Sequence, residues 1–127
     1  MSQTVFQIVT KRKVIAHVMV CVGCCCGNVE KRKPAVPEEW LKTEWRNRRL
    51  LKNVHLSISG CLGPCDVANV VKINSSDGEI WLGDLHEFHQ YRDLVDWASA
   101  CHRAGYVVSL PESLLRLQMD IYRAHPA

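Results

Sequence analysis

The sequence predicts a single α/β domain in which a strand–helix–strand unit is followed by a β-hairpin and C-terminal helices. Three observations predict it. The residues from Val54 to Ile58 alternate between apolar and polar side chains, which is typical of a strand with one buried face. Before them, Pro37 and two glutamates begin a helical pattern. After them, the turn-forming residues 74–78 separate two further apolar runs.

The first half of the chain contains the strand–helix–strand unit. A valine-rich run at about residues 15–21 predicts a buried strand, and Gly23 and Gly27 end it in a loop. The helix is expected to begin at residue 37 and to end near residue 53. The strand at residues 54–59 then lies parallel to the first one, because a right-handed crossover is the usual connection of this kind.

The second half adds the hairpin and the helices. Residues 67–73 predict a strand, and residues 80–82 predict its partner. Apolar side chains recur at helical spacing from residue 87 to residue 103, and Gly105 supplies a C-terminal stop. Residues 111–122 predict a short final helix. This order of elements is that of a thioredoxin-like domain with a mixed four-stranded sheet.

Length and composition exclude several classes of protein. A chain of 127 residues with 47% apolar residues is long enough for one globular core, so we expect one domain over residues 1–127. Seven cysteines, six of them in two patches, do not suit the disulfide framework of a small secreted protein. The apolar stretch from Val14 to Val22 is too short to span a bilayer and is a poor signal peptide. We therefore expect a cytoplasmic protein with no membrane partner.

Two groups of cysteines carry the candidate chemistry. The first group is Cys21, Cys24, Cys25 and Cys26, and the second is Cys61 and Cys65. Because both groups follow the C-terminal ends of adjacent parallel strands, we expect them to lie side by side at one edge of the sheet. Neighbouring glycines let the backbone curl around a bulky group. The sequence therefore predicts a metal or cluster site.

The cysteine spacing resembles that of a known family. The pattern Cys21-x4-Cys26, about 35 residues, then Cys61-x3-Cys65 is similar to that of the thioredoxin-like [2Fe–2S] ferredoxins and of the related [2Fe–2S] subunit of respiratory complex I. The segment from Gly60 to Cys65 resembles that family's second loop. The resemblance covers about residues 15–104 and leaves a C-terminal helical extension at about residues 110–124. It implies one two-iron cluster per chain, held by Cys21, Cys26, Cys61 and Cys65. Cys24 and Cys25 crowd the first loop, which departs from the family's pattern, and either is a candidate substitute for Cys26.

Other site chemistries remain open. Zinc bound by four thiolates is the main alternative, since Cys21-x2-Cys24 has the short spacing that structural zinc favours. A dithiol redox site at the same pair would leave the second loop unexplained. The chain has no serine–histidine–acid or paired-carboxylate pattern, so we expect an electron carrier or a binding module and no enzyme. Cys101 lies on the apolar stripe of the long helix, where a buried structural thiol is expected.

Expected partners follow from charge and from the resemblance. The basic residues 31–33 and 46–52 either form a solvated surface or dock an acidic redox partner protein. A net charge of +3 is modest, so no nucleic-acid partner is expected. The family's stand-alone members are commonly homodimers, and a homodimer is expected here through the hairpin edge at residues 67–73 and 80–82. Trp81 either faces that partner or packs beneath a helix.

Overall fold

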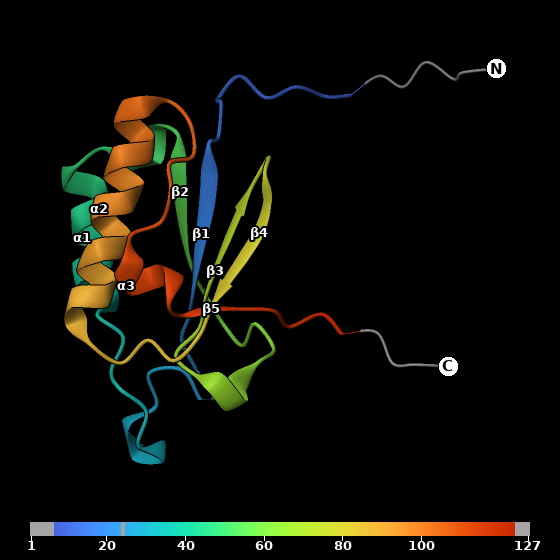
Figure 1. The fold of residues 1–127 in the computed structure, drawn as a ribbon. Coiled ribbons are helices and arrows are strands. Elements are labelled where there is room, and N and C mark those ends of the chain that lie inside the picture. The colour runs from blue at the N-terminus through green and yellow to red at the C-terminus, as the bar shows by residue number, and fades with distance from the viewer. Residues whose placement is uncertain (1–6, 24, 124–127) are drawn as a thin grey trace.

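A computed structural model describes residues 7–23 and 25–123, and Figure 1 shows its fold. Five strands form one mixed sheet in the order β2-β1-β3-β4-β5. The strands are β1 (Ala16–Cys21), β2 (Val54–Ser59), β3 (Val71–Ser75), β4 (Gly78–Leu82) and β5 (Gln118–Met119). The helices are α1 (Glu38–Asn47), α2 (Phe88–Ala104) and α3 (Glu112–Leu115), and they lie on one side of the sheet. Within the described ranges, no helix has the length and apolar character needed to cross a bilayer.

The predicted thioredoxin-like α/β fold is confirmed. β1 pairs with β2 in parallel, with Ala16 opposite Val54 and Cys21 opposite Ser59. β3 pairs with β1 and with β4 in antiparallel fashion, which makes β3 and β4 the expected hairpin. The sheet has five strands instead of four, because a two-residue strand near the C-terminus pairs with β4.

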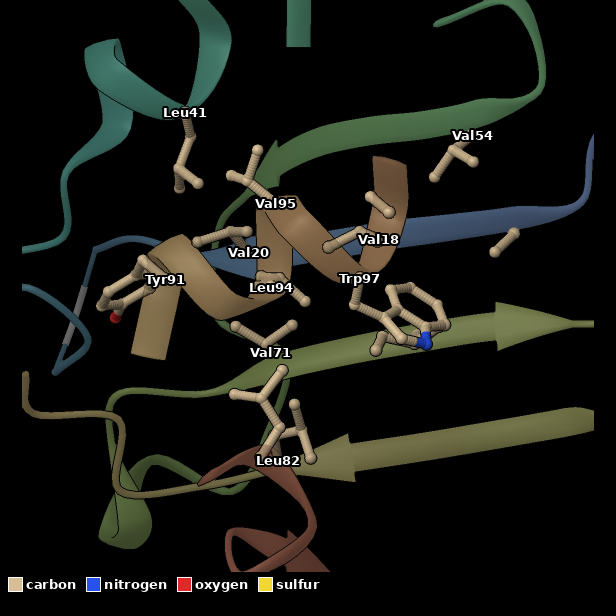
Figure 2. Packing of buried hydrophobic residues seen from close by; sticks show 14 of the residues in the cluster. Val18, Val20, Leu41, Val54, Val71, Leu82, Tyr91, Leu94, Val95 and Trp97 are labelled. Carbon is tan, nitrogen blue, oxygen red and sulfur yellow. The ribbon is translucent and has the colours of Figure 1, made fainter. Parts of the chain in front are cut away.

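The core lies between the sheet and the helices. Ala16, Val18 and Val20 of β1 are buried, whereas His17 and Met19 between them are only half-buried. This alternation directs one row of β1 side chains toward α1 and α2, as Figure 2 shows. Full burial of aliphatic side chains of this kind contributes about 1.5–3 kcal/mol each. The helix-facing side of β1 is therefore what anchors the strand that leads into the first cysteine loop.

The helix predicted to end near residue 53 ends earlier. α1 stops at Asn47, and Arg49 adopts a left-handed conformation with φ of 55°. A short 3₁₀ helix, η2 (Leu50–Lys52), follows and buries Leu50 completely. The predicted end of the helix was wrong because burial of Leu50 in the core favours a change to the 3₁₀ helix over continuation of the α-helix.

Two boundaries in the second half also differ from the prediction. Residues 65–67 form a 3₁₀ helix, η3 (Cys65–Val67), so the strand predicted at residues 67–73 begins at Val71. The predicted final helix is limited to α3, because the chain then turns and pairs β5 with β4. The N–H of Gly83 donates a hydrogen bond of 3.0 Å to the carbonyl of Leu117, which holds this C-terminal segment at the sheet edge.

Trp81 lies in neither of its two expected positions. It is only 6% exposed, and it is covered by the C-terminal segment and not by a helix. Its ring meets that of Tyr122 edge-on at 6.4 Å, and its backbone pairs with Met119. Pairing at Trp81 and Leu82 therefore covers part of the hairpin edge that was expected to be open.

Candidate metal centre

The two cysteine loops lie side by side at one end of the sheet. β1 ends at Cys21, and β2, its parallel neighbour, ends at Ser59 just before the second loop. Both loops contribute to one small hollow, which in this structure is too narrow to hold a water molecule. The cysteines that line it are Cys21, Cys25, Cys26, Cys61 and Cys65. Cys24, the other expected substitute ligand, lies outside the described residues.

Backbone hydrogen bonds shape the first loop and attach it to the sheet. The N–H of Gly23 donates to the carbonyl of Cys26 at 3.0 Å, which closes the loop on itself. The N–H of Val22 donates to Ser59 of β2 at 2.9 Å. The N–H of Cys21 donates to the carbonyl of Val70 at 3.1 Å. The loop is thus tied to both strands that flank β1.

A buried asparagine connects the first loop to the rest of the domain. Asn69 is 0% exposed, and its Oδ1 accepts a hydrogen bond of 2.7 Å from the N–H of Gly27. Its Nδ2 donates to the carbonyl of Pro34 at 2.8 Å and to the hydroxyl of Tyr91 at 3.3 Å. Sequence reasoning missed this residue. The signal that could have found it is a lone amide inside the apolar run from Val67 to Ile73.

Among the described cysteines of the site, Cys21 and Cys26 are buried. The N–H of Val70 donates to Sγ of Cys26 at 3.3 Å. Burial, followed by a hydrogen bond with Cys21, raises the pKa of Cys26 to about 12. The Cys26 side chain is therefore a neutral thiol at pH 7, and it must release its proton to become a metal ligand.

The second loop presents its thiols differently. Cys61 is exposed, whereas Cys65 is half-buried at the start of η3. The N–H of Cys65 donates to the carbonyl of Gly63 at 2.8 Å, and Gly63 has a φ of +125° that L-residues rarely adopt. In the part of the chain that the structure describes, no three His, Cys, Asp or Glu side chains are close enough together to hold a metal ion.

The donor set nevertheless fits a thiolate-bound group. The hollow is lined by five sulfur donors from two loops. Thiolates select zinc, copper(I) and iron–sulfur clusters, and N–H groups directed at cysteine sulfur stabilise such sites. The Val70 N–H directed at Cys26 is a donor of this kind.

Cys101 lies apart from this hollow. It is fully buried on α2 among the residues of the main core, and burial raises its pKa. The N–H of Val108 donates to its Sγ at 3.4 Å. Its surroundings are those of a structural thiol that packs as a small apolar side chain.

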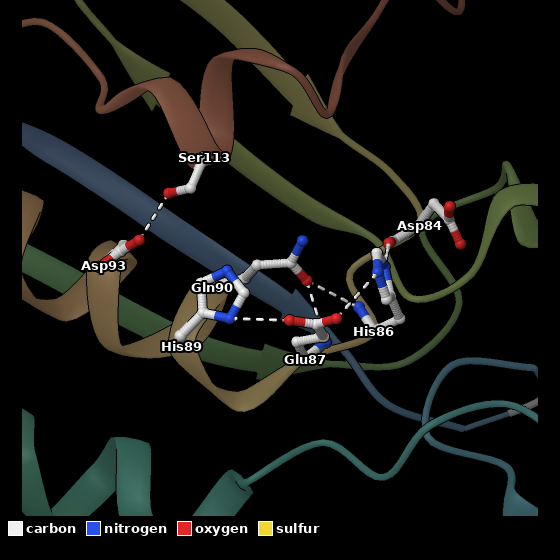
Figure 3. Close-up of polar contacts among 7 residues, drawn as sticks. All are labelled: Asp84, His86, Glu87, His89, Gln90, Asp93 and Ser113. Atoms are coloured by element: carbon white, nitrogen blue, oxygen red, sulfur yellow. Dashed lines mark hydrogen bonds and ion pairs between the residues drawn. The ribbon is translucent and has the colours of Figure 1, made fainter.

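A separate polar group lies at the start of α2 (Figure 3). Glu87 caps the helix reciprocally with Gln90, whose Oε1 accepts the N–H groups of His86 and Glu87 at 2.8 and 3.0 Å. The carboxylate of Glu87 also lies 2.9 Å from Nδ1 of His89. In α3, Ser113 donates to Asp93 of α2 at 2.5 Å. The Ser113–Asp93 contact joins α3 to α2, the other contacts are local to the start of α2, and none of them takes part in the cysteine site.

Among the known proteins compared with this chain, the similar ones are solved structures. The chain matches no protein-family model and no curated protein. It is similar to crystal structures of the thioredoxin-like [2Fe-2S] ferredoxin from Aquifex aeolicus. The wild type at 1.5 Å resolution shares 19% identity over 85% of this chain and 99% of that chain, with a TM-score of 0.49. A second structure shares 21% identity over 84% and 92%, with the same TM-score of 0.49. A likeness at these values does not assign this chain to that family.

Proposed function

We propose that this protein is a one-electron carrier that holds one [2Fe–2S] cluster on Cys21, Cys26, Cys61 and Cys65. The observation that carries the proposal is the hollow lined by thiols from both loops. When bound to four thiolates, such a cluster accepts and releases one electron. The spacing that resembles the ferredoxin family supports the same choice of ligands.

The two sides of the hollow would serve different purposes. Cys21, Cys26 and Trp81 belong to one buried cluster, against which Met119 and Ile121 of the C-terminal segment pack. This packing keeps water from the inner side and, with the Val70 N–H, would tune the reduction potential. Cys61 is exposed on the outer side, where an electron donor or acceptor can approach.

Loading the site would draw the second loop toward the first. No three ligand-type side chains of the described residues stand within reach of one ion, so binding would require the described thiols to come closer together. A Cβ placed on Gly60 or Gly63 would meet no atom within 4 Å, so both glycines have open space around them. Cys25 lines the same hollow and is the described residue placed to substitute for Cys26.

Metal and sulfide analysis of protein purified without oxygen tests the proposal. We expect a reddish-brown protein with about two irons and two acid-labile sulfides per chain. One zinc and no labile sulfide would contradict the carrier and support the alternative, a structural zinc-binding module with four thiolate ligands. Protein that takes up neither iron nor zinc on reconstitution would contradict both.

A further inference from the structure

The end of the molecule opposite the cysteine loops joins three segments that are distant in sequence. The N–H of Ile15 donates to the carbonyl of Asn53 at 2.6 Å, and Nη1 of Arg12 donates to the carbonyl of Leu51 at 3.3 Å. Oδ1 of Asn53 forms a hydrogen bond of 2.6 Å with Nδ1 of His102. We call residues 11–15, 49–53 and 102–106 the basic end. β1 begins there and runs about 17 Å to the cysteine loops, at the usual rise of a strand (Figure 1).

The basic end carries a dense positive charge. Its exposed cations are Lys11, Arg12, Lys13, Arg49, Lys52 and Arg103. Its three segments contain no acidic residue. One carboxylate from outside them, that of Asp77 in the β3–β4 turn, lines a hollow with Lys13 and Tyr106. The local excess of positive charge is thus larger than the formal net charge of +3 for the whole chain.

Large apolar side chains are exposed in or just before the same segments as these cations. Val14 and Leu51 are each 46% exposed, and Tyr106 is 66% exposed. Ile8 and Val9, just before the first basic residues, are almost fully exposed. Single exposed apolar side chains are ordinary, but exposed aliphatic groups interspersed with lysine and arginine are typical of surfaces that bind the interface of an anionic bilayer.

We propose that the basic end binds the surface of a bilayer that contains anionic lipids. Lipid headgroups supply the negative charge that complements the cations, and the interfacial region accepts Val14 and Leu51 without a matching pocket. Nucleic acid fits less well, because Tyr106 is the one aromatic residue of the basic end and aliphatic groups gain little from phosphates. An acidic protein would have to match the shape of the irregular segment before β1.

The proposal differs from the sequence-based expectation of no membrane partner. That expectation rested on the lack of a spanning segment, whereas the segments that carry these cations are joined by the contacts of Asn53 and Leu51. Binding at this end would leave the cysteine loops pointing away from the bilayer. This consequence for electron transfer rests on the proposed function, but lipid binding itself does not depend on a bound cluster.

Co-sedimentation with vesicles tests the proposal, and the chain offers a matched control. The sequence Lys-Arg-Lys occurs at residues 11–13 of the basic end and again at residues 31–33, after the first cysteine loop. We compare vesicles of phosphatidylcholine alone with vesicles that also contain phosphatidylglycerol. A basic residue near an anionic surface strengthens binding about fivefold, so replacing residues 11–13 with glutamine should weaken binding on the order of a hundredfold. The same replacement at residues 31–33 should leave most of the binding intact.

A second pair of variants tests the apolar contribution. Leu51→Ser should weaken binding to the mixed vesicles, whereas Leu115→Ser, which changes a leucine of similar exposure on α3, should not. Circular dichroism confirms that each variant is folded, and the metal content of each sample is measured separately. Equal binding to both kinds of vesicle would overturn the proposal. So would an equal loss of vesicle binding in the two glutamine variants, at residues 11–13 and at residues 31–33. Tighter binding to duplex DNA than to vesicles, unchanged by Leu51→Ser, would also overturn it.

Discussion

Asn69 and Gly27 are joined by a hydrogen bond of 2.7 Å from the backbone N–H of Gly27 to the side-chain oxygen of Asn69. The two residues are 42 positions apart, and the bond fixes the far end of the first cysteine loop to the segment that leads into β3. Gly27 has a left-handed φ of 71°, and a Cβ there would lie 3.1 Å from Cγ2 of Val36. The position of Cys26, one residue earlier, therefore depends on a glycine and an asparagine that are not themselves ligands.

Asn69→Ala should destabilise the protein by about 1–3 kcal/mol, because it leaves the part-buried N–H of Gly27 and the carbonyl of Pro34 without their partner. Chemical denaturation measures the change. Tyr91→Phe is the matched control, since it removes only the longer 3.3 Å contact to Asn69 and should cost less. A cost below about 0.5 kcal/mol for Asn69→Ala would show that this bond does not hold the loop.

Serine variants should separate ligand cysteines from structural ones. Cys61→Ser or Cys65→Ser should abolish or strongly perturb the visible spectrum of the iron-loaded protein, because each removes a proposed ligand from the second loop. Cys101→Ser should leave the spectrum unchanged, since Cys101 packs in the main core. Cys26→Ser is the informative case, because Cys25 lines the same hollow. A normal spectrum for Cys61→Ser would argue against the site.

Two adjacent leucines of α3 should differ sharply in their contribution to stability. Leu114 is 0% exposed and belongs to the main core, whereas Leu115 is 45% exposed. Leu114→Ala should lower the free energy of unfolding by about 2–5 kcal/mol, and Leu115→Ala by no more than about 0.5 kcal/mol. Equal effects, measured by urea denaturation, would show that α3 does not pack on the domain in solution.

Stability should decrease below about pH 6.5 because of His17. Burial, and then the charge of His55 with its ring 6.0 Å away, lowers the pKa of His17 below its usual value of 6.5. The unfolded chain therefore binds this proton more readily, so the free energy of unfolding falls as pH drops through about 6.5. His17→Gln should flatten that slope. An unchanged slope in His17→Gln would show that His17 does not cause the loss of stability.

The homodimer stays a prediction that a mass measurement decides. β5 covers the outer edge of β4 at Trp81 and Leu82, so only residues 78–80 of that edge remain for pairing among the described strands. β2 pairs with β1 alone in the described sheet and offers a second edge. Light scattering at micromolar concentration should give twice the mass of the 14.4 kDa chain. A mass close to one chain would rule the dimer out.

Much of the fold could be predicted from the sequence because the relevant signals are local. The period-two pattern of β2 and the helical spacing of α2 arise within each segment, and both elements form where they were expected. The side-by-side cysteine loops follow from the same local signals, since parallel neighbours end at one edge of the sheet. The identity of the metal ligands is still a prediction.

Contacts between residues far apart in the sequence decided the remaining features of the fold and of the site. The sequence alone determined which segments form strands and helices and where the thiols lie along them, because backbone preference and apolar periodicity act within a few residues. Only the tertiary structure paired β5 with β4, buried Asn69 behind the first cysteine loop, and brought Lys13, Lys52 and Arg103 to one end. These arrangements depend on hydrogen bonds and packing across about 40 or more positions, and no periodicity within a segment encodes them.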